Sequence, residues 1–190
     1  TTEALDWLES EKDRPFFLYM PFAIPHLSIQ VPAASLSEYK DLIQEEAYKH
    51  RGYLPHPTPR AGYAAMVTHM DRGVGQIMAR VAELGLDDNT LIIFSSDNGC
   101  SKAAGIGNLA KQGHIVSAHL RGSKADLWDG GHRIPFIVKG PGIEAGSRVP
   151  GNVYLLDVLA TLCDLAKIDA PRTSEGISFK PVLMGDKEQV

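Results

Sequence analysis

Apolar residues recur at three- and four-residue spacing through residues 60–84, and this pattern predicts a long amphipathic helix. Gly85 follows the last apolar position and is the residue type that most often ends a helix. Residues 153–167 show the same spacing and predict a second helix with a broad apolar face. Shorter or more acidic helical patterns cover residues 1–11, 35–50 and 176–185.

Continuous apolar runs predict buried strands at residues 16–20, 91–94 and 134–139. The first two runs flank the long predicted helix, and the order strand, connection, helix, strand is typical of a parallel sheet. We therefore expect an α/β fold with a mostly parallel sheet and helices on both faces. Residues 51–60 are rich in proline and predict an irregular loop rather than a domain linker, since both sides show the same α/β pattern.

Asp97, Asn98 and Gly99 come directly after the strand predicted at residues 91–94. Ligands of open α/β sheets lie beyond the carboxyl ends of the strands, and carboxylate and amide oxygens suit Ca²⁺ or Mg²⁺. The same three residue types also form ordinary turns, so the tripeptide alone leaves both interpretations open. His26 follows the first predicted strand in a similar way, although a lone loop histidine is more often a surface or structural residue.

The composition of this 190-residue chain is that of an ordinary globular domain, with 44% hydrophobic and 22% charged residues. Its net charge of -4 and the lack of a basic run argue against nucleic-acid binding. No apolar stretch approaches the length of a membrane span. Cys100 and Cys163 form neither a disulfide framework nor a zinc-binding pattern. Composition therefore excludes these classes of protein but indicates no activity.

A long stretch with little pattern, residues 100–133, separates the last two predicted strands and is rich in basic residues and glycine. Loops of this length inside compact domains are usually functional or disordered. The stretch lacks the third glycine of a dinucleotide fingerprint and the spacing of a phosphate-binding P-loop. Its side chains with candidate chemistry are Lys102, Lys111, His114, His119, Arg121, Lys124, Trp128, Asp129 and His132.

Several different short motifs follow one another along the chain in a characteristic order. They lie at residues 15–20, 25–26, 63–99, 120–124, 128–136, 139–142, 156–157 and 176–178. Together they resemble the type I sulfatases, the formylglycine-dependent branch of the alkaline phosphatase superfamily. Each motif alone is unspecific, but their order and spacing are specific, and they cover nearly the whole chain. The resemblance implies an arylsulfatase-like catalytic domain, an α/β/α sandwich that hydrolyses sulfate esters with the help of calcium.

The resemblance also implies roles for individual residues of this chain. Asp97 and Asn98 match two of the family's calcium ligands, with magnesium as an alternative metal. Lys124 matches the lysine that contacts the substrate sulfate, and His26 matches a histidine near the leaving oxygen, where it donates a proton. His119 is a candidate substrate contact. We therefore expect Asp97, Asn98, Lys124 and His26 to meet in a single pocket at one edge of the sheet.

The nucleophile of the family has no counterpart in this sequence. That nucleophile is a formylglycine made from the Cys or Ser of a Cys/Ser-x-Pro-x-Arg motif, and neither Cys100 nor Cys163 lies in one. The paired aspartates that complete the family's calcium site are absent as well. The resemblance implies that residues 1–190 are the middle and C-terminal part of a catalytic domain, without its N-terminal half and its C-terminal subdomain. We expect weak calcium binding and no turnover by this chain alone.

Two other interpretations stay open beside the sulfatase fragment. One is a phosphoryl-transfer hydrolase of the same superfamily, and the other is a non-catalytic, degenerate sulfatase that serves as a binding module. The leading interpretation predicts a sulfated small molecule or glycan as partner, with no nucleic acid and no membrane span. Exposed sheet edges would favour self-association. Sulfatases of this family are periplasmic, secreted or lysosomal, and the sequence does not choose among these compartments.

Overall fold

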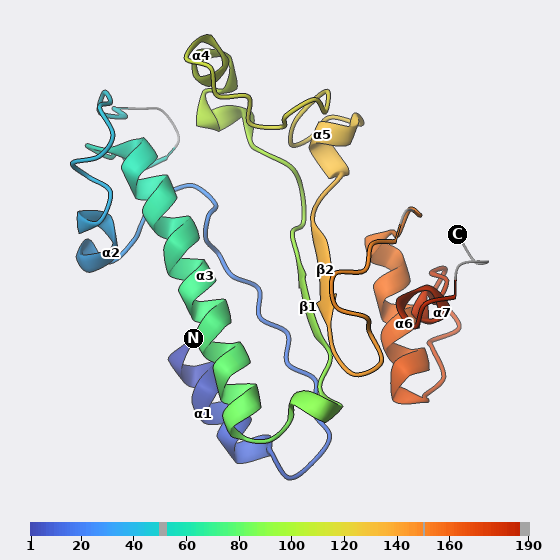
Figure 1. Ribbon diagram of the computed structural model, residues 1–190. Coiled ribbons are helices and arrows are strands. Elements are labelled where there is room, and N and C mark those ends of the chain that lie inside the picture. The colour runs from blue at the N-terminus through green and yellow to red at the C-terminus, as the bar shows by residue number, and fades with distance from the viewer. Residues whose placement is uncertain (50–52, 150, 187–190) are drawn as a thin grey trace. The chain divides into compact units, whose positions relative to one another are not determined.

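The computed structural model describes residues 1–49, 53–149 and 151–186, and the chain forms two compact units, Thr1–Asp87 and Asp88–Val190. The helices of the first unit are α1 (Thr2–Glu11), α2 (Ala33–Ser37) and α3 (Pro59–Glu83) (Figure 1). The strands and helices of the second unit are β1 (Ile92–Ser95), α4 (Ile106–Lys111), α5 (Asp129–His132), β2 (Phe136–Lys139), α6 (Leu155–Ala166) and α7 (Lys180–Leu183). Short 3₁₀ helices cover Asp87–Asn89 and Lys102–Ala104.

The long helix α3 confirms the prediction for residues 60–84, and Pro59 occupies its first turn, where a missing N–H breaks no hydrogen bond. The carboxylate of Glu45 accepts hydrogen bonds from the backbone N–H groups of Arg60 and Ala61, at 2.5 and 3.0 Å. The first N–H groups of a helix have no partner within the helix. Glu45, which lies well before α3 in the sequence, therefore caps this end of the helix.

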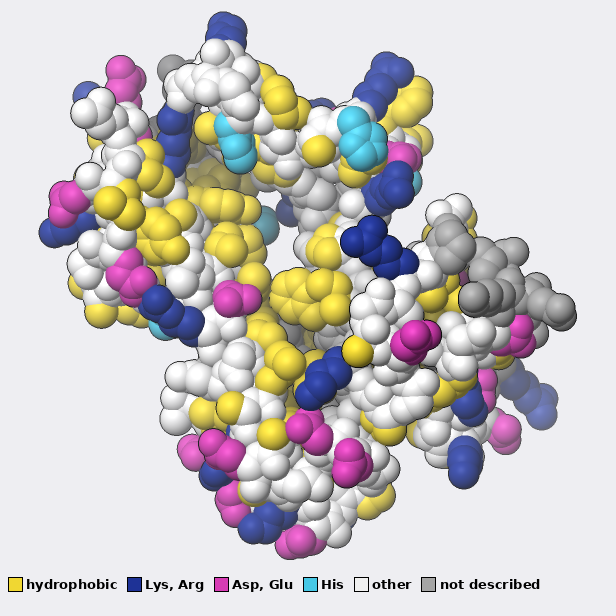
Figure 2. All heavy atoms as spheres, viewed as in Figure 1, with side chains coloured by type: hydrophobic (Ala, Val, Ile, Leu, Met, Phe, Trp, Pro, Cys, Tyr) yellow, Lys and Arg dark blue, Asp and Glu magenta, His cyan; other side chains and the backbone are white. Residues whose placement is uncertain are grey.

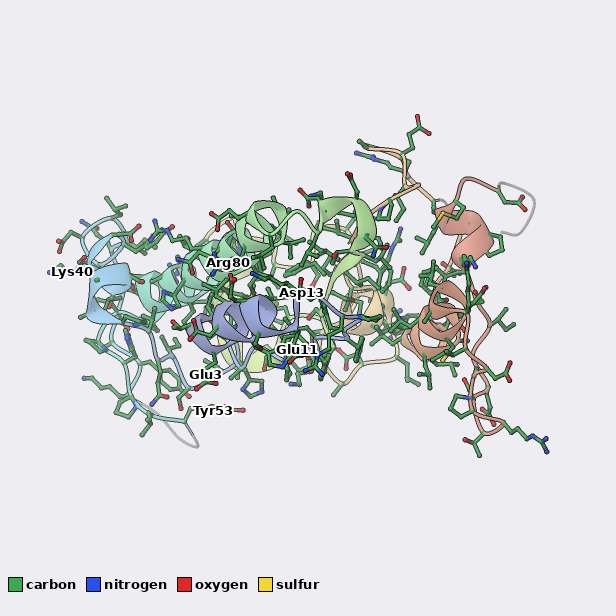
Figure 3. All side chains as sticks on the ribbon, turned by 90° about the horizontal axis from the view of Figure 1, so that it is seen from below. Glu3, Glu11, Asp13, Lys40, Tyr53 and Arg80 are labelled. Atoms are coloured by element: carbon green, nitrogen blue, oxygen red, sulfur yellow. The ribbon has the colours of Figure 1, made fainter. Side chains whose placement is uncertain are left out.

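The helix α1 confirms the prediction for residues 1–11 and packs on α3. Leu8 of α1 and Met66 of α3 are among the largest fully buried side chains of the described residues. At the edge of this contact, Arg80 of α3 forms an ion pair with Glu9 of α1 at 2.8 Å, and Figure 3 labels Arg80. The first unit is thus held by a small apolar core with charged pairs at its rim.

The helix predicted over residues 35–50 is wrong beyond its first turn, because α2 ends at Ser37. Residue 50 lies outside the described residues. The polar side chains after α2 contact α3 instead of continuing a helix, and the hydroxyl groups of Tyr39 and Thr68 lie 2.6 Å apart. The acidic pattern of this segment reflects partners on α3, such as the pair of Glu38 with Arg72.

The strand predicted at residues 16–20 is also wrong, since the one sheet in the described part of the chain joins β1 and β2. Phe17 and Tyr19 are 70% and 74% exposed, while their neighbours are half-buried. This alternation is that of an extended segment with one face covered. An apolar run becomes a strand only where a neighbouring backbone completes its hydrogen bonds, and sequence periodicity does not supply that neighbour.

The strands β1 and β2 confirm the predictions for residues 91–94 and 134–139, but they pair antiparallel. Ile92 lies opposite Lys139, and Ser95 lies opposite Phe136. The parallel arrangement follows from the strand predicted at residues 16–20, before β1, and this strand does not form. The residues of β1 are half-buried.

The helices α6 and α7 confirm the last two helical predictions and are joined by the segment between them. The carboxylate of Asp157 in α6 accepts hydrogen bonds from the N–H of Tyr154 at 3.0 Å and of Ile177 at 2.9 Å. The rings of Phe136 in β2 and Phe179 meet edge to face, with centroids 5.6 Å apart. These contacts attach the helical pair to the sheet of the second unit.

Candidate functional site

The turn after β1 presents the two predicted metal ligands near solvent. Asp97 is exposed, and within the described parts of the chain its carboxylate makes neither a hydrogen bond nor an ion pair. Asn98 is half-buried, and its backbone carbonyl accepts a hydrogen bond from the hydroxyl of Ser96 at 3.2 Å. A carboxylate without a protein partner keeps its oxygens available for a cation.

Gly99 joins this turn to the short helix α5. Its N–H donates to the carbonyl of Gly131 at 2.9 Å. A Cβ at this position would lie 1.9 Å from the carbonyl oxygen of Gly130, closer than any side chain can approach. Glycine is therefore required here for close contact between two backbones.

Lys124 lies beside the same turn through its backbone. Its N–H donates to the carbonyl of Cys100 at 2.8 Å, and the preceding Ser123 is almost completely buried. Together with the bond from Gly99 to Gly131, this hydrogen bond places the segment of Asp97 and the segment of Lys124 side by side within the second unit. The structure thus brings these two chain segments together, and the roles of their side chains stay predictions.

Asp126 stabilises the turn that carries Lys124. Its carboxylate accepts hydrogen bonds from the N–H and hydroxyl of Ser123 at 3.0 and 3.1 Å and from Lys102 Nζ at 2.8 Å. The hydrogen bond from Lys102 holds the pKa of Asp126 below its usual value, and Ser123 adds to this effect. No role is predicted for Asp126 from the sequence, although glycine, serine and aspartate, the residue types of this segment, are common in turns.

The histidines of residues 100–133 lie at the surface of the second unit. His132 has a structural contact, since its Nε2 lies 3.0 Å from the carbonyl oxygen of Leu127. His119 is exposed in the turn in which the N–H of Leu120 donates to Ser117, and its role as a substrate contact stays a prediction. His114 follows α4 and is exposed, and its backbone hydrogen bond to Leu109 indicates no functional role.

His26 belongs to the first unit, and its position relative to Asp97 and Lys124 stays a prediction. It is exposed, and its Nδ1 lies 2.5 Å from the carbonyl of Leu27. Its ring meets that of Tyr53 edge on, with centroids 6.4 Å apart.

The candidate metal ligands are of the chemical type that a hard cation prefers, but they are too few to complete its coordination. Asp97 and Asn98 offer oxygen atoms, whereas Ca²⁺ takes roughly six to eight oxygen ligands. In residues 1–49, 53–149 and 151–186 there is no group of three or more His, Cys, Asp or Glu side chains placed to hold a metal ion. The described residues therefore offer at most part of the metal site that the sulfatase resemblance implies.

Neither cysteine has the environment of a nucleophile. Burial raises the pKa of the Cys100 thiol, which favours its unreactive thiol form. Cys163 is buried in α6, away from solvent. Both are free thiols. In the part of the chain that the structure describes, no helix combines the length and the apolar character that spanning a membrane requires.

Comparison with known protein families finds that the family described as "Sulfatase" matches residues 1–168. An arylsulfatase of Hemicentrotus pulcherrimus is 31% identical over 187 residues, which cover 97% of this chain and 29% of that protein. A steryl-sulfatase of Rattus norvegicus is 29% identical over 192 residues, again covering 97% of this chain and 29% of the relative. The chain thus spans less than a third of the length of these curated relatives.

The solved structure of a protein named Ps i-CgsB, in complex with k-i-k-neocarrahexaose, is similar to the whole chain. The TM-score is 0.79 at 26% identity, and the similarity covers 98% of this chain and 38% of that one. This likeness confirms the predicted α/β class of fold, in an incomplete form.

Proposed function

Because this chain belongs to the Sulfatase family, we propose that it is part of the catalytic domain of a sulfuric ester hydrolase. The observation that carries the proposal is the pair of backbone hydrogen bonds, from Gly99 to Gly131 and from Lys124 to Cys100. They hold a candidate metal-binding turn beside a candidate sulfate-binding lysine. Such an arrangement suits an ester that carries a spread negative charge.

Each candidate residue has a task in the hydrolysis of a sulfate ester. Asp97 and Asn98 would hold part of a calcium site, and a bound divalent cation orients the sulfate and stabilises negative charge. Lys124 would place a fixed positive charge against the sulfuryl oxygens, for which a compact ammonium is well suited. His26 would hold the proton that the leaving oxygen needs, since an imidazole exchanges protons near neutral pH.

The remaining parts of such a site would have to come from polypeptide outside residues 1–190. Two oxygen ligands do not complete a calcium site, and no Cys/Ser-x-Pro-x-Arg motif is present to yield a formylglycine. The expected substrate is a sulfated small molecule or glycan. The complex of Ps i-CgsB with an oligosaccharide supports a glycan as one choice.

The experiment that tests the proposal uses the protein that contains this chain together with the rest of its catalytic domain. We expect hydrolysis of 4-nitrophenyl sulfate, loss of that activity on removal of Ca²⁺ by chelation, and much slower hydrolysis of 4-nitrophenyl phosphate. Lys124→Gln should lower kcat/KM by at least about a hundredfold, because an oxyanion-stabilising charge is lost. Lys111→Gln, an exposed lysine at the end of α4, is the matched control.

Other outcomes would favour the two alternatives. Faster hydrolysis of the phosphate ester would assign the chain to a phosphoryl-transfer enzyme of the same superfamily. No hydrolysis of either ester by a protein without a formylglycine motif would favour a degenerate sulfatase that binds without reacting. Loss of activity in Lys111→Gln as large as in Lys124→Gln would contradict the role proposed for Lys124.

A further inference from the structure

Arg121 and Trp128 form an exposed stacked pair on the loop that carries Lys124. The guanidinium carbon of Arg121 lies 3.7 Å from the centroid of the Trp128 ring. Trp128 is 51% exposed and the neighbouring Leu127 is 96% exposed. Large apolar side chains are rarely left in water without a reason when they cluster, so this surface is a candidate for a binding function.

The charge of Arg121 is not compensated by the acids of its own loop. Asp126 is engaged by Lys102 at 2.8 Å, and Asp129 lies 3.6 Å from Arg133. Within the residues that the structure describes, the side chain of Arg121 forms no ion pair and no hydrogen bond, and its contact is the indole ring. Its N–H groups therefore remain available to an anion from outside.

The backbone holds this pair close to the candidate site. The N–H of Gly130 donates to the carbonyl of Arg121 at 2.7 Å, and Gly131 accepts the hydrogen bond from Gly99. Lys124 follows Arg121 by three residues in the same loop. Figure 2 shows basic and histidine side chains on the surface around α5, in the part of the chain to which this loop belongs.

We propose that Arg121 and Trp128 form a second anion-binding subsite, which takes a sulfate or carboxylate group carried by a sugar ring. A guanidinium binds such groups through two parallel hydrogen bonds, and stacking on the indole restricts its orientation before the ligand arrives. The exposed indole edge and Leu127 offer apolar surface to the C–H face of the sugar. The subsite rests on the proposed function, in which Lys124 binds the reacting sulfate, and it selects sugars with more than one acidic group.

Binding of sucrose octasulfate to this chain, measured by isothermal titration calorimetry, tests the subsite without requiring hydrolysis. Arg121→Gln should weaken binding about tenfold, since a charge-assisted bidentate contact is lost. Arg133→Gln is the matched control, because it removes the same charge from the same segment and should change the affinity less than twofold. Unsulfated sucrose should not bind, and circular dichroism shows whether each variant folds like the parent chain.

Fluorescence supplies a readout that a purely structural role of the pair would not move. The chain contains two tryptophans, and Trp7→Phe leaves Trp128 as the reporter. Sucrose octasulfate should change the emission of Trp128 in this background, with the affinity found by calorimetry, and sucrose should not. Equal affinity of the parent and Arg121→Gln, or equal losses in Arg121→Gln and Arg133→Gln, would overturn the subsite.

Kinetics on the protein with its complete catalytic domain separate this inference from the proposed function. Arg121→Gln should raise KM about tenfold for an oligosaccharide with several sulfates, leave kcat unchanged, and leave 4-nitrophenyl sulfate hydrolysis unchanged. Failure to hydrolyse either sulfate ester would contradict the proposed function, while the calorimetry would still decide the subsite. Equal effects of Arg121→Gln on both substrates would contradict the subsite alone.

Discussion

The backbone N–H of Gly99 donates to the carbonyl oxygen of Gly131 at 2.9 Å, and no side chain fits between these two segments. The contact joins the turn that presents Asp97 to the loop that carries Lys124 and Arg121. The proposed metal site, the proposed sulfate site and the anion subsite therefore share this close approach of two backbones, beside the hydrogen bond from Lys124 to Cys100. The close approach can be tested by adding a single methyl group.

Gly99→Ala should destabilise the second unit by about 1–3 kcal/mol, because the added Cβ forces two backbones apart. Gly107→Ala is the matched control, since Gly107 lies inside α4 with open space around its Cα. The control should be neutral or stabilising by up to about 1 kcal/mol, as alanine favours a helix over glycine. Urea unfolding followed by Trp128 fluorescence in the Trp7→Phe background measures both. Equal stabilities of the two variants would contradict the contact.

Asp126→Asn should destabilise the turn of Lys124 in a way that depends on pH. The pKa of Asp126 is lowered in the folded chain by Lys102 and Ser123, so its contribution is present above the ordinary Asp pKa of about 3.9. It is lost as the pH falls through the lower, folded value, because the folded carboxyl then takes up its proton. The stability difference between the parent and Asp126→Asn should therefore be present at neutral pH and vanish in acid.

Urea unfolding at a series of pH values measures this difference. Asp129→Asn is the control, because its carboxylate is more exposed and lies 3.6 Å from its partner Arg133. A difference for Asp126→Asn that persists undiminished in acid would show that the ion pair with Lys102 is not its cause.

Glu45→Ala should destabilise the first unit by about 1 kcal/mol, because two N–H groups at the start of α3 lose their acceptor. Glu46→Ala removes the same charge from the next residue, which is exposed and has no hydrogen bond among the described residues. The thermal midpoint of unfolding should fall for Glu45→Ala and stay within error for Glu46→Ala. If both variants lose the same stability, the effect comes from overall charge and not from capping.

Calcium should bind to this chain alone only weakly, with a Kd of about millimolar, because two protein oxygens leave most of the coordination to water. Isothermal titration calorimetry with CaCl₂ measures the affinity, and Asp97→Asn should abolish the residual heat. Asp88→Asn, which removes a carboxylate from the turn before β1, should leave it unchanged. Micromolar binding by the parent chain would mean that further ligands lie within it.

The sequence alone determined the positions of the main helices and of β1 and β2, because burial imposes a period on each element that can be read locally. It also identified the motifs of the Sulfatase family, which the family comparison confirms over residues 1–168. The strand predicted at residues 16–20 does not form, because this apolar run has no neighbouring strand to pair with. The helix predicted at residues 35–50 ends early, because acidic residues of this segment bind groups on α3 instead.

Only the tertiary structure decided which segments meet. Three contacts join residues whose local sequence does not indicate their partner. They are the antiparallel pairing of β1 with β2, the hydrogen bond from Gly99 to Gly131, and the stacking of Arg121 on Trp128. Backbone hydrogen bonds are formed by every residue type except proline as donor, so the choice between partners depends on the whole packing arrangement and not on residue identity. Glycine at position 99 is the exception, because there the sequence had to leave room for another backbone.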